Sequence, residues 1–261
     1  MIREALAASG IDAREARLLL AAATGFSESA VVAFPEREIA PPVFEKFASF
    51  VQRRKGEEPI AYILGRKEFY GLELAVNPAV LIPRPETELL VELALERRPS
   101  SVLDLGTGSG AVALAIKQHL PAAKVAAVES SAAALAVAQR NAVKHNLEVE
   151  FLHGQWFHPV AGRRFDLVVS NPPYVAAGDP HLAGLRHEPQ SALVAGIDGL
   201  DAIREIAHKA PAHLAPGGWL LLEHGLGQAQ AVRAILAGAG LETVTTWPDL
   251  AGIARVTGGK G

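Results

Sequence analysis

The sequence predicts an α/β protein whose larger part is a doubly wound parallel sheet. From Ser101 onward, short continuous apolar runs alternate with longer segments of helical periodicity. That alternation is typical of buried parallel strands joined by helices. The first apolar run enters a glycine-rich turn that opens a helix, as in ligand-binding βα units. Before Ser101 the sequence has a different character, so we expect a second, smaller domain.

Residues 1–60 are predicted to form an N-terminal helical bundle. Residues 11–25 begin with an aspartate that can cap a helix and end in a glycine that can stop one. A second helix is predicted over residues 43–54, after two prolines. Its apolar side chains fall on one stripe, which we interpret as the core of the bundle. These residues are Phe44, Phe47, Phe50 and Val51.

Residues 61–85 are predicted to form a β-hairpin linker, with short β-like pieces at 67–76 and 79–83. The α/β domain then spans residues 86–261 and starts with a helix over 86–98. Its strands are predicted at residues 101–105, 124–129, 149–153, 165–170, 218–224, 241–247 and 253–258. Its remaining helices are predicted at residues 110–120, 131–145, 200–214 and 227–240.

Composition excludes several classes of function. The chain has 261 residues, a formal charge of −3 and no cysteine, so it lacks both a global basic field for duplex DNA and a thiolate metal site. The nine histidines show no metal-binding spacing, and we expect no metal. No apolar run is long enough to span a bilayer, and the N-terminus lacks the apolar stretch of a signal peptide. We expect a cytoplasmic protein.

The glycine-rich turn predicts a ligand site. Gly106, Gly108 and Gly110 allow a tight turn and close approach of a ligand to the backbone. With Ala111 in the last position, the turn also satisfies the fingerprint of nicotinamide-dinucleotide enzymes. Glu129 ends the second strand, nineteen residues after Gly110. It can accept hydrogen bonds from both ribose hydroxyls of an adenosine, or it can be a solvated strand-end acid.

Two features favour S-adenosyl-L-methionine over a nicotinamide cofactor. Asp104 precedes the first glycine by two residues, where its carboxylate can meet a ligand ammonium, directly or through water, or can tie down the loop. The segment SNPPY (170–174) follows the fourth strand, on the same rim of the sheet as the glycine loop. Hydride transfer has no evident need for this segment, whereas methyl transfer to an amide-like nitrogen does.

The prolines of SNPPY can build a rigid pair of acceptors. A conjugated nitrogen is a poor nucleophile, and acceptors that take both of its N–H bonds can turn its lone pair toward an electrophile. The side chain of Asn171 and the carbonyl of Pro172 offer two such oxygens, and the prolines hold them stiffly. Tyr174 can lie flat against the planar group. We predict catalytic roles for Asn171, Pro172 and Tyr174; the alternative is a turn that merely ends the strand.

Several long motifs make the chain resemble a known family. They lie at residues 57–91, 102–115, 168–175, 185–196, 220–225 and 249–259. Together they resemble the HemK family of peptide-chain release factor glutamine N5-methyltransferases over essentially the whole sequence. NPPY alone also occurs in methyltransferases that act on amino groups of DNA and RNA. The LIPRPETE segment before the glycine loop, joined to RHEP after NPPY, is more specific.

The resemblance implies a class I (Rossmann-like) S-adenosylmethionine-dependent methyltransferase fold of seven strands, the last antiparallel. It implies methylation of the glutamine amide in the Gly-Gly-Gln motif of class 1 release factors, with S-adenosyl-L-homocysteine as product. No nucleic acid or membrane partner is expected, and we expect a monomer. The implied cofactor residues are Gly106, Thr107, Gly108, Ser109, Gly110, Glu129, Trp156 and Asn171. The implied substrate-binding residues are Asn171, Pro172, Pro173 and Tyr174.

This sequence departs from the family pattern in two places. The ribose-binding acid is more often Asp than Glu129, and Gln155 stands where relatives commonly carry Asp. Trp156 can contact adenine or simply pack on the third strand. The main rival function is an amino-group methyltransferase acting on DNA or RNA, and a non-catalytic adapter is a third reading. We expect Arg84, Glu86 and Thr87 to border the cleft and Arg186 and Glu188 to steady it, with no chemical role for any of them.

Overall fold

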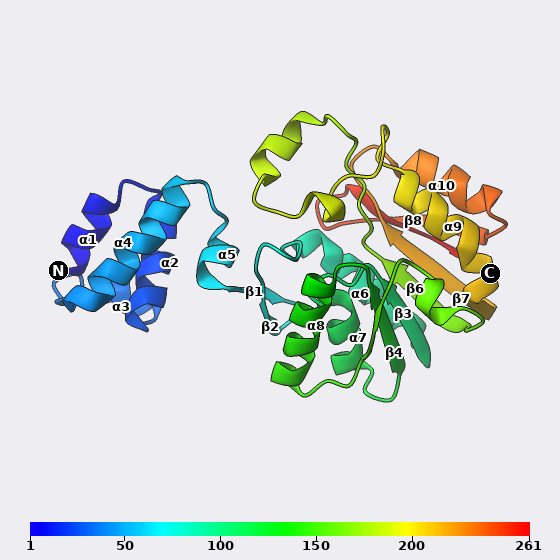
Figure 1. Cartoon of the computed structure of the whole chain (residues 1–261), viewed down its shortest axis with the longest axis horizontal. Helices are drawn as coiled ribbons and strands as arrows, with labels where there is room; N and C mark the ends of the chain where they lie inside the picture. Colours follow the sequence, from blue (N-terminus) through cyan, green and yellow to red (C-terminus); the bar gives the residue numbers. More distant parts are fainter. The chain divides into compact units, whose positions relative to one another are not determined.

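A computed structural model describes residues 1–261, and the chain divides into two compact units. The first unit is Met1–Arg66 and the second is Lys67–Gly261. None of the helices combines the length and apolar character that crossing a membrane requires. Figure 1 shows both units, with most of their helices and strands labelled.

The first unit consists of five helices around a small apolar core. They are α1 (Ile2–Ser9), α2 (Ala13–Thr24), α3 (Glu28–Ala33), α4 (Pro41–Lys55) and α5 (Ile60–Leu64). Asp12 caps α2 by accepting hydrogen bonds from two backbone N–H groups, and Gly25 ends the helix in the left-handed conformation. The aspartate and the glycine that the sequence analysis expected to begin and end this helix therefore do so.

The apolar stripe of α4 is only partly buried. Phe47 and Val51 are buried, and Phe50 packs against the same core. Phe44 is 46% exposed, so its assignment to the core was wrong. This residue lies in the first turn of α4, directly after the two prolines that open the helix.

The hairpin is formed by β1 (Arg66–Phe69) and β2 (Leu72–Ala75). Its two-residue turn, Tyr70 and Gly71, has positive φ at both positions, which suits the twist of the strands it joins. The β-like piece expected at 79–83 is wrong, because this segment forms no strand. Prolines interrupt it, and the N–H of Ile82 donates to the Glu188 side chain instead of a ladder partner.

The second unit contains a seven-stranded sheet. Its strands are β3 (Ser101–Leu105), β4 (Lys124–Glu129), β5 (Glu150–His153), β6 (Phe165–Ser170), β7 (Leu214–Glu223), β8 (Glu242–Pro248) and β9 (Ala254–Lys260). They lie in the order β5-β4-β3-β6-β7-β9-β8. Neighbouring pairs are parallel from β5 to β7, whereas β9 is antiparallel to both β7 and β8. This arrangement confirms the predicted sheet with its antiparallel last strand.

Helices cover both faces of the sheet (Figure 1). One apolar core joins the sheet to α6 (Glu88–Arg97), α7 (Ala111–His119), α8 (Ala132–His145) and the hairpin. A second core joins the opposite face to α9 (Asp201–His213) and α10 (Ala229–Gly238). Short 3₁₀ helices lie at Pro85–Thr87, His158–Val160, Pro180–Leu185 and Gln190–Ala192.

The strand order fixes the place of the site. The chain proceeds from β3 to β4 on one side and later from β6 to β7 on the other. The crevice outside the carboxyl ends of strands at such a reversal is the usual binding position in open α/β sheets. Here the glycine loop follows β3, and the NPPY segment follows β6. Glu129 is the last residue of β4, and Glu223 is the last residue of β7.

Candidate active site

The glycine loop turns through left-handed backbone conformations between β3 and α7. Gly106, Gly108 and Gly110 have φ angles of 71°, 57° and 84°. At Gly110 a Cβ atom would also lie 3.0 Å from a methyl carbon of Leu114 and 3.3 Å from Cβ of Ala138. A glycine is therefore required there by both backbone and space. The loop ends where α7 begins, so the N–H groups of the first turn of this helix lie beside the loop.

Glu129 is tied to this loop. Its Oε2 accepts a hydrogen bond from the Gly108 N–H (2.9 Å), and its Oε1 accepts one from the Ser131 N–H (2.9 Å). The residue is 9% exposed and lines a pocket of about 280 Å³ beside the glycine loop, the main pocket of the site. Oε1 also accepts from the Ser130 hydroxyl at 3.4 Å, whereas Oε2 has a further lone pair with which it can accept from a ligand hydroxyl.

Asp104 lies deeper beside the same loop. It is 2% exposed, and its Oδ2 accepts a hydrogen bond from the Thr107 hydroxyl at 2.6 Å. Burial raises the pKa of the Asp104 carboxyl to about 7, against the lowering effect of that hydrogen bond. At neutral pH the carboxyl is therefore poised between its charged and neutral forms. A ligand cation would favour the charged form.

Trp156 lies beside the glycine loop, and its contact with adenine stays a prediction. Its ring packs partly against the second core and also lines the main pocket. Its indole N–H donates to Oε2 of Glu205 at 3.0 Å, which fixes the ring plane. The residue has φ 47°, a left-handed conformation uncommon for a non-glycine residue. A Cβ on Gly106 would lie 3.5 Å from the ring, so ring and loop are close.

Two pockets flank the glycine loop. The larger, of about 280 Å³, contains most of the predicted cofactor residues together with parts of segments 79–81 and 189–192. The smaller, of about 50 Å³, lies beside Asp104, Thr107 and Ser109. Both are lined by Gly106, Gly108 and Asn171. The lining of these two pockets does not include Gly110, Pro172 or Tyr174.

Asn171 stands where the two pockets meet. Its Nδ2 donates a hydrogen bond to the Thr87 hydroxyl at 3.1 Å. Its Oδ1 is buried and has no hydrogen-bond partner in the protein. The carbonyl oxygen of Pro172 likewise takes part in none of the hydrogen bonds of the chain. A buried acceptor without a partner is costly, and the Oδ1 of Asn171, at the edge of both pockets, is placed to receive donors from a ligand.

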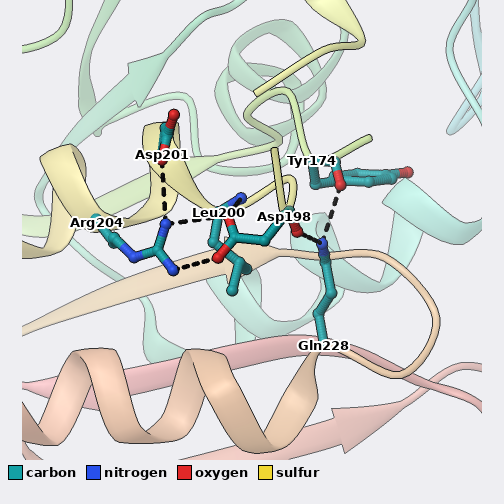
Figure 2. A network of polar contacts seen from close by, with 6 residues as sticks. All are labelled: Tyr174, Asp198, Leu200, Asp201, Arg204 and Gln228. Atoms are coloured by element: carbon teal, nitrogen blue, oxygen red, sulfur yellow. Dashed lines mark hydrogen bonds and ion pairs between the residues drawn. The ribbon is translucent and has the colours of Figure 1, made fainter. Parts of the chain in front are cut away.

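Tyr174 is held at both ends. Its hydroxyl donates to Oε1 of Glu223 at 3.3 Å, and burial raises the pKa of the phenol. Its backbone carbonyl accepts a hydrogen bond from Nε2 of Gln228 at 2.9 Å, as Figure 2 shows. The Gln228 Oε1 in turn accepts from the Gly225 N–H at 2.7 Å. These contacts anchor the NPPY segment to the loop after β7.

The same network braces the loop before α9. Gln228 also donates to the Asp198 carbonyl, and the Asp198 carboxylate accepts from Arg204 and from the Leu200 N–H (Figure 2). Between them, Gly199 lies so close to Tyr174 that a Cβ would stand 2.2 Å from the Tyr174 carbonyl oxygen. A side chain at position 199 would therefore displace the NPPY backbone.

Glu223 is a functional candidate that the sequence analysis did not single out. It ends β7, is 1% exposed, and its Oε2 has no hydrogen-bond partner. Burial raises the pKa of the carboxyl to about 7, while the hydrogen bond from the Tyr174 hydroxyl and the nearby charge of Arg255 lower it. An acid at the carboxyl end of an otherwise apolar strand, on the rim that carries NPPY, was a usable signal.

A partly buried ion pair joins a residue expected to border the cleft to one expected to steady it. Arg84 binds the Glu188 carboxylate, whose side chain is 3% exposed. The other oxygen of Glu188 accepts from the Ile82 N–H at 3.1 Å. This pair joins the segment before the glycine loop to the segment after NPPY, and parts of both line the main pocket. Thr87 is buried within the site itself rather than at its border.

The sequence matches two family models. Residues 1–65 match the PrmC N-terminal domain, and residues 85–186 match the methyltransferase small domain. A release factor glutamine methyltransferase of Xylella fastidiosa is 52% identical over 229 residues, which cover 85% of this chain and 83% of the relative. The Bordetella pertussis enzyme of the same name is 46% identical over 266 residues, with 99% and 98% covered.

This chain belongs to the release factor glutamine methyltransferase family. Membership confirms the resemblance read from the sequence and the enzyme class that it implied. A solved methyltransferase of Pyrococcus furiosus superposes with a TM-score of 0.59 at 20% identity, covering 80% of this chain and 96% of that one. This likeness supports the methyltransferase fold alone. The individual site residues rest on the geometry described above.

Proposed function

We propose that this family member transfers a methyl group from S-adenosyl-L-methionine to the side-chain amide nitrogen (N5) of the glutamine in the Gly-Gly-Gln motif of class 1 release factors. The observation that carries the proposal is the unpartnered Oδ1 of Asn171 at the meeting point of two pockets. A primary amide brings two N–H donors, which is what this acceptor and the Pro172 carbonyl can receive.

The residues around the glycine loop fit the cofactor. Glu129 offers acceptor positions for ribose hydroxyls, and Trp156 offers a ring face in the same pocket. Asp104, beside the smaller pocket, suits the ammonium of the methionine part. When bound, S-adenosylmethionine supplies a methyl carbon that its sulfonium centre already activates.

The remaining work of the chain is positioning. Asn171 and Pro172 accept the amide hydrogens and orient the nitrogen lone pair, and proline rigidity keeps the two oxygens in place. Tyr174 is fixed through its hydroxyl and its carbonyl, so its ring can stack on the planar amide. No strong general base is required, because the nitrogen loses a proton readily once it is alkylated. The mechanism therefore needs no metal.

The proposed partner is a folded protein rather than a nucleic acid. The net charge of −3 gives no global attraction to phosphates, which dominate nucleic-acid affinity. We expect the enzyme to act as a monomer in the cytoplasm, where release factors function.

The test is incubation of the purified chain with S-adenosylmethionine and a class 1 release factor, followed by mass spectrometry of the tryptic peptide that contains Gly-Gly-Gln. We expect one added methyl group on the glutamine. A release factor with Gln replaced by Ala at that position is the control and should gain nothing. A parallel reaction with tritiated cofactor and DNA or RNA is the competing arm. Label in the nucleic acid alone would overturn the proposal.

A further inference from the structure

The side-chain amide of Gln228 binds three backbone groups. Its Oε1 accepts a hydrogen bond from the Gly225 N–H at 2.7 Å. Its Nε2 donates to the carbonyl of Tyr174 at 2.9 Å and to that of Asp198 at 3.4 Å. Figure 2 shows the amide nitrogen between these two carbonyl oxygens. Since a side-chain amide has two N–H donors, both of them are used on the NPPY segment and the loop before α9.

Gln228 extends from a backbone that a core helix holds in place. It directly precedes α10, and its carbonyl accepts a hydrogen bond from the Val232 N–H at 2.9 Å. Val232 and Leu236 bury α10 against the second core of the sheet. The carbonyl of Tyr174 is therefore tied to the folded core through Gln228.

Two glycines allow the neighbouring loops to pack directly on Tyr174. A Cβ on Gly199 would overlap the Tyr174 carbonyl oxygen and lie 2.9 Å from Nε2 of Gln228. A Cβ on Gly225 would lie 3.2 Å from the Cδ2 ring carbon of Tyr174 and 3.0 Å from Oε1 of Gln228. The loop before α9 thus packs on the carbonyl of Tyr174, and the loop after β7 packs on its ring.

The NPPY segment is stiff, so a shift at one end changes its whole length. Ser170, the last residue of β6, is paired with both neighbouring strands. The two prolines then fix φ near −65°, and the residue before each proline is restricted to extended conformations. Few torsions are left to absorb a displacement of the Tyr174 carbonyl. Such a displacement should therefore turn the carbonyl of Pro172 and the side chain of Asn171.

We propose that Gln228 is a positioning residue that holds the Tyr174 carbonyl and thereby keeps the NPPY acceptors and the Tyr174 ring aligned for the substrate amide. The inference rests on the proposed function for the identity of that substrate. Gln228 lines neither of the two pockets, so it acts only through the NPPY segment. The glycine loop and Glu129 follow or end other strands, and its loss should leave cofactor binding in place.

The test is Gln228→Glu in the full-length chain. The carboxylate has nearly the same shape and still accepts from Gly225, but it has no donor for the two carbonyls. Turnover on a class 1 release factor is measured at saturating S-adenosylmethionine, per cofactor-binding site counted by calorimetry. We expect turnover to fall about 30-fold, since a misplacement of about 1 Å can cost about 100-fold. The cofactor dissociation constant should change less than about threefold.

Two further variants separate positioning from charge and from folding. Gln118→Glu adds the same charge at an exposed glutamine of α7 and is the matched control, with turnover and affinity unchanged. Gln228→Met has a similar length, no charge and no hydrogen bond to give, and its turnover should fall about tenfold. If Gln228→Glu does not fold, Gln228→Met decides the question. Undiminished turnover, or a fall matched by an equal loss of cofactor affinity, would overturn the inference.

A substrate-free measurement distinguishes failure of this inference from failure of the proposed function. The N–H groups of Val175 and Ala177 donate to carbonyls of the loop before α9 at 2.8 and 2.7 Å. Their hydrogen exchange, followed by mass spectrometry, should be at least about fivefold faster in Gln228→Glu and unchanged in Gln118→Glu. Absence of release-factor methylation by the unaltered protein would reject the proposed function and leave exchange to judge the anchor. Equal exchange in Gln228→Glu and the unaltered protein would overturn the inference.

Discussion

The backbone N–H of Gly108 donates a hydrogen bond to Oε2 of Glu129 over 2.9 Å. Glu129, which ends β4, therefore both holds the glycine loop and lines the main pocket. One side chain therefore joins the loop that follows β3 to the carboxyl end of β4.

Replacement of Glu129 by Ala should weaken cofactor binding much more than it slows turnover at saturation. Loss of hydrogen bonds to a charged acceptor costs about 1.5–3 kcal/mol each, so we expect the dissociation constant to rise about 30-fold. Isothermal titration calorimetry with S-adenosylmethionine measures this. Glu129→Asp is the matched variant and should stay within about threefold of the unaltered protein. Unchanged affinity in Glu129→Ala would remove the residue from the ribose site.

Asn171→Ala should slow turnover much more than it weakens cofactor binding. It removes the acceptor for the substrate amide, so turnover should fall at least about 100-fold, because positioning and electrostatics supply most of the rate. Cofactor affinity should change less than about threefold. The control is Asn146→Gly, at the exposed left-handed residue that ends α8, where turnover should be unaffected. Single-turnover methylation of a release factor measures the rate, and an undiminished rate in Asn171→Ala would refute the role.

The sequence predicted the sheet and the glycine loop because both follow from local patterns. Buried parallel strands are continuous apolar runs, and Gly106 and Gly110 have positive φ, a backbone conformation that favours glycine whatever the neighbouring residues. Reliance on local pattern also explains why the strand predicted at 79–83 was wrong. Its apolar residues look like a strand, but Val80 and Ile82 are buried by tertiary packing, and a glutamate side chain takes the Ile82 N–H.

The supports of the site could not be predicted, because each depends on contacts between distant segments. Thr87 and Asn171 hydrogen-bond each other at a sequence separation of 84 residues, and Gln228 and Tyr174 do so at a separation of 54 residues. Trp156 similarly finds Glu205 on another element. The local sequence around each of these residues does not indicate its partner. Residues proposed to contact a ligand lie in recognisable motifs, whereas the residues that support them are brought together only by the tertiary fold.

The buried pair Arg84–Glu188 should matter for stability. Removal of Arg84 leaves a carboxylate that is 3% exposed without its charged partner. Loss of one member of a buried pair is strongly destabilising, and because Arg84 itself is a third exposed we expect about 2 kcal/mol for Arg84→Ala. Arg163→Ala breaks the exposed Arg163–Glu150 pair and is the control, at less than about 1 kcal/mol. Urea unfolding at pH 7 compares the two, and equal losses would contradict the prediction.

Asp104→Asn should stabilise the ligand-free protein, and more so at high pH. The folded-state pKa of about 7 lies above the ordinary value of 3.8, so the folded chain binds this proton more tightly than the unfolded chain does. Stability contributed by this group is therefore present at low pH and is lost as pH rises to about 7. Between about pH 5 and pH 8 the variant should gain about 2 kcal/mol relative to the unaltered protein, or about 5 °C in Tm.

Asp166→Asn provides the contrasting control for that measurement. Hydrogen bonds from Ser100 and Ser101 hold the pKa of Asp166 below its ordinary value, so the group is ionised in both states above about pH 5. The difference in Tm between Asp166→Asn and the unaltered protein should thus be the same at both pH values. The pH-dependent gain must appear for Asp104 alone.

The stability gained by Asp104→Asn has a functional cost, because a neutral amide cannot pair with the cofactor ammonium. We expect about tenfold weaker S-adenosylmethionine binding by Asp104→Asn at pH 8, and equal affinity there would restrict Asp104 to holding the loop through Thr107.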